Sequence, residues 1–140
     1  SLVCLVEQEQ VLIAADTVLP MPHFVDGSHA DLLRSLQGLD AMSARYETVV
    51  QGHGEVLLRG EVQQRLREDI TYLQRLDAEI ARRIEQTPYE NDLDAQTLQA
   101  VTPELCGKSR VLLNGAAVPL HRQNALWLAA ERRKQQLPID

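Results

Sequence analysis

The strongest constraint on the fold of this chain is a pair of short apolar runs near its start. Residues 2–6 (LVCLV) and 11–15 (VLIAA) are rich in aliphatic side chains, and the polar residues 7–10 separate them. Short apolar runs joined by a brief polar link predict a hairpin of β-strands. Because neither run alternates apolar with polar residues, we expect helices to cover both faces of the sheet.

A third strand and a helix follow from the next patterns. Residues 47–51 (ETVVQ) predict a strand, which ends at the glycines on either side of His53. Before this strand, leucines recur at helical spacing over 29–41. Ser28 is placed to cap that helix, and Asp31 gives a variant of the capping box. The order strand, helix, strand indicates an α/β chain with one small sheet.

The second half of the chain is predicted to be helical. Apolar residues recur at helical spacing from Val62 to Ile84, which predicts one long helix over 61–86. A shorter helix capped by Asp94 follows, and Pro119 opens a final helix. The side chains expected to face inward in that last helix are Leu120, Leu126, Trp127 and Ala130.

Composition excludes several classes of protein. The 14 basic and 20 acidic residues give a net charge of −6, which argues against nucleic acid or an anionic membrane surface as a partner. No apolar run approaches the roughly 18 residues that a membrane span needs. Cys4 and Cys106 make no disulfide framework and are typical of a reducing compartment, so we expect a cytoplasmic protein.

Two polar residues stand at the ends of apolar strands. Asp16 ends the second apolar run, and His53 follows the third predicted strand between two glycines. If these strands run parallel, their ends lie side by side at one edge of the sheet. A carboxylate and an imidazole there make half of a first-row metal site, because a catalytic zinc takes three protein ligands. Taken singly, Asp16 is also a common turn residue, and a pair of glycines also makes a flexible turn.

These segments resemble parts of the metallo-β-lactamase superfamily. Residues 11–18 (VLIAADTV) resemble the strand that delivers the metal-bridging aspartate of that family. Residues 47–54 (ETVVQGHG) resemble the strand and loop that deliver its last metal histidine. The helix at 29–41 and the long helix after Gly60 stand in their family places. Residues 120–124 (LHRQN) are similar to the closing helix of glyoxalase-II-like members.

The chain departs from the family pattern in its histidines. It has 4 histidines and lacks the His-x-His-x-Asp-His signature of the family's N-terminal half. Residues 2–6 resemble the strand after the family's His-Thr-x-Gly-Ser segment, and Ala15 stands where many members have glycine. The resemblance implies the C-terminal half of an αββα sandwich. Residues 1–86 would form this half-domain, a small sheet with packed helices, and residues 87–140 would form a helical extension packed on it.

The resemblance also implies a function. Family members are metal-dependent hydrolases in which a metal-bound hydroxide attacks a substrate. In the glyoxalase-II-like and lactonase-like branches, the substrate is a small-molecule ester, thioester or lactone. Members hold two metal ions, usually zinc; Asp16 would bridge the ions, and His53 would complete the ligands of the second. Neither is the nucleophile, so no catalytic residue is assigned. We expect the 140 residues alone to be inactive and to hold no stable zinc pair, because two ligands do not hold two ions.

Three residues of the loop after Asp16 are further candidates. His23, Asp26 and His29 are expected to lie over the site, as substrate contacts or surrogate metal ligands. The alternative is that all three are ordinary loop residues in water. For His121, at the start of the last helix, a packing or surface role is expected.

Two other interpretations stay open. In the first, the chain is a non-catalytic module, and either a second copy or a missing N-terminal half covers its apolar surface, with a homodimer as the simplest form. In the second, the chain is an ordinary small α/β domain without a metal site. That interpretation predicts that Asp16 and His53 lie more than about 8 Å apart, too far to share one ion.

Overall fold

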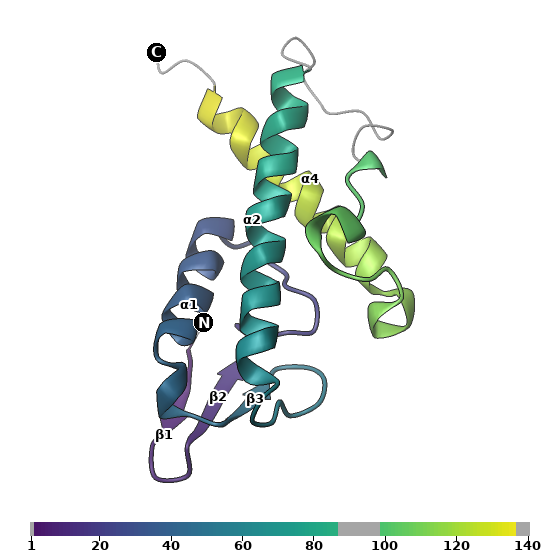
Figure 1. The fold of residues 1–140 in the computed structure, drawn as a ribbon. Helices are drawn as coiled ribbons and strands as arrows, with labels where there is room; N and C mark the ends of the chain where they lie inside the picture. The colour runs from purple at the N-terminus through teal and green to yellow at the C-terminus, as the bar shows by residue number, and fades with distance from the viewer. Residues whose placement is uncertain (1, 87–98, 137–140) are drawn as a thin grey trace. The chain divides into compact units, whose positions relative to one another are not determined.

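The computed structural model describes residues 2–86 and 99–136, whose fold is shown in Figure 1. Contacts group the chain into two units, Ser1–Thr71 and Tyr72–Asp140. The boundary falls inside helix α2 (Val62–Gln86). The predicted helix capped by Asp94 lies outside the described residues. Among the described helices, none combines the length and apolar character needed to cross a membrane.

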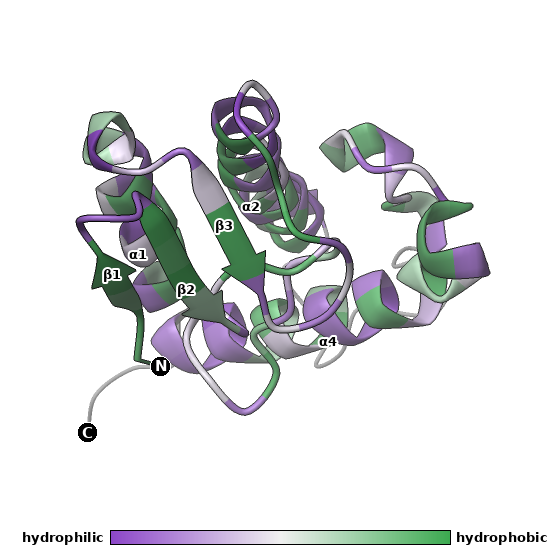
Figure 2. Ribbon diagram, turned by 90° about the horizontal axis from the view of Figure 1, so that it is seen from below, coloured by the Kyte–Doolittle hydropathy of each residue, from purple (hydrophilic) through white to green (hydrophobic). Residues whose placement is uncertain are grey.

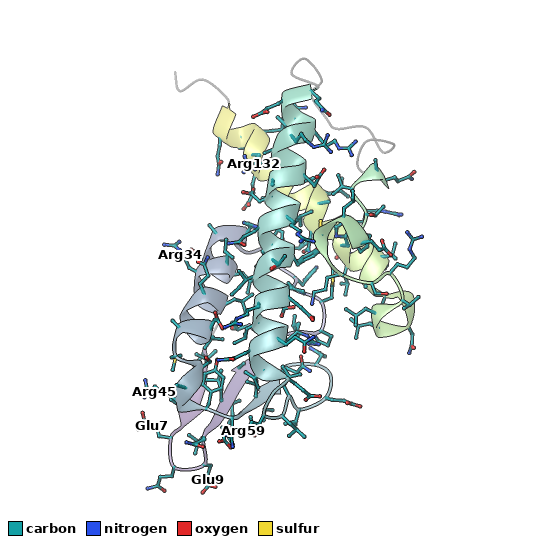
Figure 3. The ribbon with its side chains drawn as sticks, in the orientation of Figure 1. Glu7, Glu9, Arg34, Arg45, Arg59 and Arg132 are labelled. Atoms are coloured by element: carbon teal, nitrogen blue, oxygen red, sulfur yellow. The ribbon has the colours of Figure 1, made fainter. Side chains whose placement is uncertain are left out.

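The first unit contains a small mixed sheet. Its strands β1 (Cys4–Val6), β2 (Val11–Ala15) and β3 (Thr48–Gln51) lie in the order β1-β2-β3. β1 and β2 form the predicted antiparallel hairpin, and β2 and β3 run parallel. An ion pair between Glu7 and Arg45, both labelled in Figure 3, ties the hairpin turn to the chain just before β3. The coarse α/β prediction is confirmed.

One face of this sheet is buried. Residues paired across neighbouring strands point to the same face. Leu12 pairs with both Leu5 and Val49, and Leu12 and Val49 are buried. Helices α1 (His29–Ala41) and α2 lie on this side of the sheet, as Figure 2 shows from the opposite side. The core of the first unit therefore lies between the sheet and these helices.

The other face of the sheet is apolar and open to solvent. Ile13 and Val50 pair with each other, and they are 44% and 37% exposed. We call this surface the outer face; it comprises Cys4, Val6, Ile13 and Val50. The expectation that both faces are covered is wrong for the described chain. The reason is that, within the first unit, α1 and the start of α2 both pack on the same side of the sheet, and no described helix of that unit covers the other side (Figure 2).

Helix α1 begins and ends as the sequence predicts. The Ser28 hydroxyl accepts a hydrogen bond from the Asp31 amide at 3.2 Å, which satisfies one free donor of the first turn. Leu36 and Leu39 are buried on the inner side of the helix. After α1 the chain makes a short 3-10 turn, η1 (Ser43–Arg45), before it enters β3. The helix therefore connects two parallel strands, as in a strand–helix–strand unit.

Helix α2 carries the predicted apolar stripe. Val62 and Leu66 are buried in the first unit, and the buried members in the second unit are Leu73, Leu76, Ile80 and Ile84. Such a stripe gives the helix a wide apolar side for packing, whereas its polar side carries arginine and glutamate. The second unit also contains η2 (Glu104–Cys106), η3 (Leu112–Gly115) and α4 (Ala117–Gln136).

The inward side of α4 differs from the prediction. Leu126 is 50% exposed, Ala130 is exposed and Trp127 is only half-buried. The buried residues of this helix are instead Ala117, His121, Asn124, Ala125, Leu128 and Ala129. The apolar pattern of the sequence does not predict this buried side, because two of the residues on it, His121 and Asn124, are polar.

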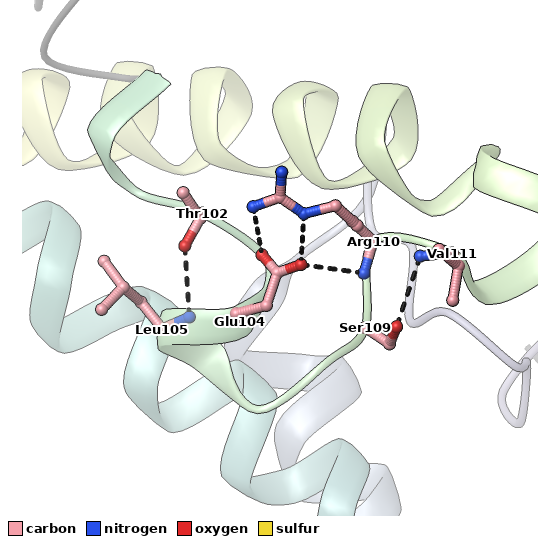
Figure 4. A network of polar contacts seen from close by, with 6 residues as sticks. All are labelled: Thr102, Glu104, Leu105, Ser109, Arg110 and Val111. Carbon is pink, nitrogen blue, oxygen red and sulfur yellow. Dashed lines mark hydrogen bonds and ion pairs between the residues drawn. The ribbon is translucent and has the colours of Figure 1, made fainter.

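A polar network closes the loop between η2 and η3, as Figure 4 shows. The Arg110 side chain and backbone both donate to the Glu104 carboxylate, at 2.7 and 3.1 Å. These bonds from Arg110 lower the pKa of Glu104 to about 2. Thr102 accepts from the Leu105 amide at 3.3 Å and so caps the turn in which Glu104 lies. The loop is therefore ordered by its own side chains.

Candidate functional site

The parallel pairing of β2 and β3 brings Asp16 and His53 together. Ala15 pairs with Gln51 at the ends of the two strands; Asp16 follows Ala15 directly, and His53 follows Gln51 after Gly52. Asp16 Oδ1 lies 3.4 Å from His53 Nδ1. The predicted separation of more than about 8 Å between these two residues is therefore wrong. The predicted meeting of a carboxylate and an imidazole at one sheet edge is confirmed.

A local irregularity in β2 sets the direction of Asp16. The register between β2 and β3 shifts between Ile13 and Ala15, and Ala15 has a φ of 47°, in the left-handed region. An alanine there is strained, whereas glycine is not. The backbone turn after Ala15 carries Asp16 toward the end of β3.

Gly52 fills the space between the two strand ends. Its amide donates to the Ala15 carbonyl at 2.7 Å. A Cβ at residue 52 would lie 2.1 Å from Asp16 Oδ1 and 2.8 Å from the Ala15 carbonyl carbon. Both distances are shorter than any ordinary contact, so only glycine lets the backbone and the Asp16 carboxylate approach this closely.

Gly54 is required by the second half of the same loop. Its φ is +100°, and a Cβ there would lie 2.9 Å from Pro20 Cγ and 3.0 Å from Gln51 Nε2. The Gln51 Nε2 donates to the Glu55 carbonyl at 2.5 Å, across the loop that holds His53. Gln51 is not predicted from the sequence as a site residue. The available signal is a polar residue at the end of an apolar strand, directly before Gly52.

The Asp16–His53 pair faces solvent. The Asp16 side chain is 69% exposed and the His53 side chain 80% exposed. Protonated His53 would form an ion pair with the carboxylate, whereas neutral His53 leaves a nitrogen lone pair beside it. Both side chains can therefore be reached from the solvent.

The separation of the pair fits two ligands of one zinc ion. Ligand bonds of about 2.0–2.1 Å at a tetrahedral angle place the two donor atoms roughly 3.3 Å apart. Asp16 Oδ1 and His53 Nδ1 are 3.4 Å apart. A carboxylate oxygen and an imidazole nitrogen are both ordinary zinc ligands. Across residues 2–86 and 99–136, no group of three or more His, Cys, Asp or Glu side chains is placed to hold a metal.

The loop candidates lie near each other in sequence but differ in environment. His29 is buried in the first turn of α1, where its ring meets Phe24 edge-on with centroids 5.2 Å apart. This packing suits a core histidine. His23 is half-buried, and Asp26 is exposed in a turn closed by a hydrogen bond from the Gly27 amide to the Phe24 carbonyl. Contact between these three residues and a substrate stays a prediction.

Two hollows of the first unit lie away from this pair. One, of about 360 Å³, is lined by residues of and just after η1 and by residues of and just before the start of α2, among them Ser43, Tyr46, Arg59 and Gln63. The other, of about 560 Å³, lies against β1 and includes Val3, Leu5, Leu12 and Met42. Neither is lined by Asp16 or His53, so the pair lies on an open surface rather than in one of these hollows.

The second unit holds a buried polar cluster. The Tyr72 hydroxyl lies 3.0 Å from His121 Nδ1 and accepts from Asn124 Nδ2 at 3.1 Å. His121 Nε2 lies 2.8 Å from the Val101 carbonyl, which only a protonated Nε2 can satisfy. His121 Nδ1 then accepts from Tyr72 when the ring is neutral, and burial lowers the pKa of His121. His121 therefore has a packing role.

Cys106 is buried in the same unit. Burial raises the pKa of its thiol to about 12, so the thiol stays protonated at neutral pH. Because the thiolate is the nucleophile in cysteine chemistry, Cys106 is unsuited to that role.

Comparison of the chain with models of protein families, with curated proteins and with solved structures found no match. The similarity to the metallo-β-lactamase superfamily therefore stays a hypothesis that rests on short segments. The geometry of the Asp16–His53 pair is independent of that similarity.

Proposed function

We propose that Asp16 and His53 are two ligands of a metal centre, and that the chain is the C-terminal part of a metal-dependent hydrolase of the metallo-β-lactamase type. The observation that carries this proposal is the distance of 3.4 Å between Asp16 Oδ1 and His53 Nδ1 at the shared end of two parallel strands. The proposed substrate class is a small ester, thioester or lactone.

Each residue has a distinct part in this proposal. Asp16 supplies an anionic oxygen that offsets the positive charge of the ion, and His53 supplies a neutral nitrogen. Gly52 allows the Asp16 carboxylate to lie against the end of β3. When bound, a divalent ion polarises a substrate carbonyl and lowers the pKa of water. Because residues 2–86 and 99–136 hold no group of three ligands, the remaining ligands would come from outside these residues, in the same protein or in a second chain.

Zinc affinity tests the ligand assignment in the chain itself. Calorimetric titration with zinc would compare the unaltered chain with Asp16→Asn, His53→Gln and the double variant. We expect each single variant to weaken zinc binding by more than about tenfold, since even residues that only support a ligand cost 10–100-fold. Asp31→Asn is the control, because this exposed carboxylate pairs with Arg34 and not with a histidine.

The result that contradicts the assignment is equal zinc affinity in the unaltered chain and the double variant. The hydrolase part is tested on the protein as encoded, with any residues that precede Ser1. The coding DNA is first read for a His-x-His-x-Asp-His segment upstream. Asp16→Ala and His53→Ala should then lower both metal content and thioester or lactone hydrolysis. Full activity in either variant would reject the proposal.

A second candidate is a non-catalytic homodimer, which the exposed outer face favours. Exposed apolar patches on a sheet promote association, and a twofold pair is the commonest form. This candidate predicts a dimer whose mass does not change when a chelator is added. A metal centre that a second copy completes would instead lose mass under the chelator.

A further inference from the structure

His53 is held almost entirely by its backbone. Its side chain is 80% exposed, so few contacts of its own restrain it. The position of a metal ligand must nevertheless be fixed closely, because small displacements weaken a metal site. The restraint on His53 must therefore come from the loop of Gly52, His53 and Gly54.

We propose that Gln51 is the positioning residue that holds this loop, and with it His53, beside Asp16. The inference deepens the proposed function and rests on it for the ligand role of His53. Its basis is the hydrogen bond from Gln51 Nε2 to the Glu55 carbonyl at 2.5 Å. This bond spans the three loop residues and joins the end of β3 to the residue that follows Gly54.

The two ends of the loop are fastened differently. At its start, the Gly52 amide donates to the Ala15 carbonyl at 2.7 Å, so the loop is tied to the strand that carries Asp16. At its end, the Gln51 side chain holds Glu55, and two residues further on the backbones of Val49 and Leu57 pair through two hydrogen bonds of 2.9 Å. Loss of the Gln51 bond would therefore lengthen the unfastened stretch around His53, so that it runs from Gly52 to Leu57.

Gly54 packs directly over the Gln51 amide. A Cβ at residue 54 would lie 3.0 Å from Gln51 Nε2, so the loop backbone and the amide are in close contact. Removal of the amide would therefore release Gly54 as well as Glu55. Both changes act on the residues that follow His53.

The burial of Gln51 is unusual for its position. The side chain is 8% exposed, on the side of β3 where Val49 is buried. An amide at such a place costs free energy unless it is hydrogen-bonded, so an aliphatic residue would stabilise the sheet more. Within the described chain, Gln51 Oε1 has no hydrogen-bond partner. The Nε2 bond to Glu55 is therefore the interaction that a substitution removes.

The test is Gln51→Met, which keeps the length of the side chain and removes the donor. Gln64→Met is the matched control, because Gln64 is exposed on α2 and bonds only locally to Glu68. Backbone relaxation and amide exchange at residues 52–55 would be measured without metal. Zinc affinity and stability to urea would be measured on the same samples.

We expect Gln51→Met to increase the mobility of residues 52–55 and to weaken zinc binding by about tenfold, whereas Gln64→Met changes neither. Stability should fall little, because an unpaired buried oxygen is removed with the bond. If the methionine variant does not fold, Gln51→Glu is the second variant, since an ionised carboxylate cannot donate to Glu55.

The outcomes separate the two proposals. A more mobile loop with weaker zinc binding supports both. If the protein as encoded, with any residues that precede Ser1, binds no zinc, a more mobile loop supports the positioning by Gln51 and rejects the proposed metal centre. An unchanged loop overturns the role of Gln51, whatever zinc does.

Discussion

The Asp16 carboxylate occupies the space that a side chain at residue 52 would need: a Cβ there would lie 2.1 Å from Asp16 Oδ1. The glycine does not need an unusual φ for this. It needs the absence of a side chain, because the end of β3 and the Asp16 carboxylate meet at van der Waals distance. The site therefore depends on a residue that contributes no functional group.

Gly52→Ala should displace Asp16 and disturb the end of β2. The added methyl also meets the Ala15 carbonyl carbon at 2.8 Å, so backbone must move. We expect a loss of stability of about 1–3 kcal/mol, as for other overpacked sites, together with weaker zinc binding. Urea denaturation and zinc titration measure the two effects.

Gly38→Ala is the control for this substitution. Gly38 lies in α1, and a Cβ there meets nothing within 4 Å. Alanine is expected to stabilise the helix by about 0.5–1 kcal/mol. Equal effects of the two substitutions would show that residue 52 tolerates a side chain and would remove the steric argument.

Ala15→Gly should stabilise the chain although it removes a methyl group. Ala15 has a φ of 47°. Relief of left-handed strain is worth about 1–2 kcal/mol, and glycine costs about 0.5–1 kcal/mol in chain entropy. The expected gain is up to about 1.5 kcal/mol in urea denaturation. Ala14→Gly, at a buried neighbour, should destabilise instead; a loss in both variants would contradict the strain.

Tyr72→Phe should cost more than the loss of one hydrogen bond. The hydroxyl serves both His121 and Asn124, so its removal leaves two buried polar groups without this partner. A buried group left unpaired costs about 1–3 kcal/mol. Tyr46→Phe is the comparison, because the Tyr46 hydroxyl donates only to the Leu39 carbonyl. Equal losses of stability in urea would mean that the cluster is not cooperative.

The same cluster should make stability depend on pH. Burial lowers the pKa of His121 in the folded chain, and the unfolded chain keeps an ordinary histidine pKa near about 6.5. The unfolded state therefore binds more protons, and stability falls as the pH drops below that value toward the folded pKa. Above the histidine pKa of the unfolded chain, the contribution of His121 to stability does not change with pH. Urea curves at several pH values, with His121→Gln as reference, measure this effect; identical pH dependence in both chains would contradict it.

The sequence patterns predicted some parts of this fold well and others not. The helix cap at Ser28 and the pairing of Asp16 with His53 follow from local rules, because a cap and a strand end depend on few residues. The buried side of α4 does not, because it contains His121 and Asn124. Their partners, Tyr72 and Val101, are distant in sequence, so a periodic pattern cannot reveal them.

The outer face shows a second limit of pattern reasoning. Ile13 and Val50 lie in continuous apolar runs, which usually indicate strands covered on both sides. The pattern predicts that an apolar surface exists, but it does not predict what covers it. In the same way, Gln51 looked like the end of a strand, and its bond to Glu55 became visible only in three dimensions.

Ile13→Thr should weaken self-association if the outer face joins two copies. Threonine keeps the β-branched shape that suits a strand and replaces the ethyl branch of isoleucine by a hydroxyl. Light scattering over a range of concentrations would give the mass of each chain. Val111→Thr is the control, since Val111 is exposed in the second unit. A monomer at every concentration in the unaltered chain would reject the homodimer.

Trp127 allows the unfolding of the second unit to be followed separately by fluorescence. It is the only tryptophan of the sequence, and it lies half-buried in α4, so fluorescence reports on the second unit. Circular dichroism sees every helix and strand together. In a denaturation experiment, coincident curves from the two methods would indicate one cooperative transition. A loss of circular dichroism at denaturant concentrations at which the tryptophan signal is still that of the folded chain would instead show the unit with the Asp16–His53 pair unfolding first.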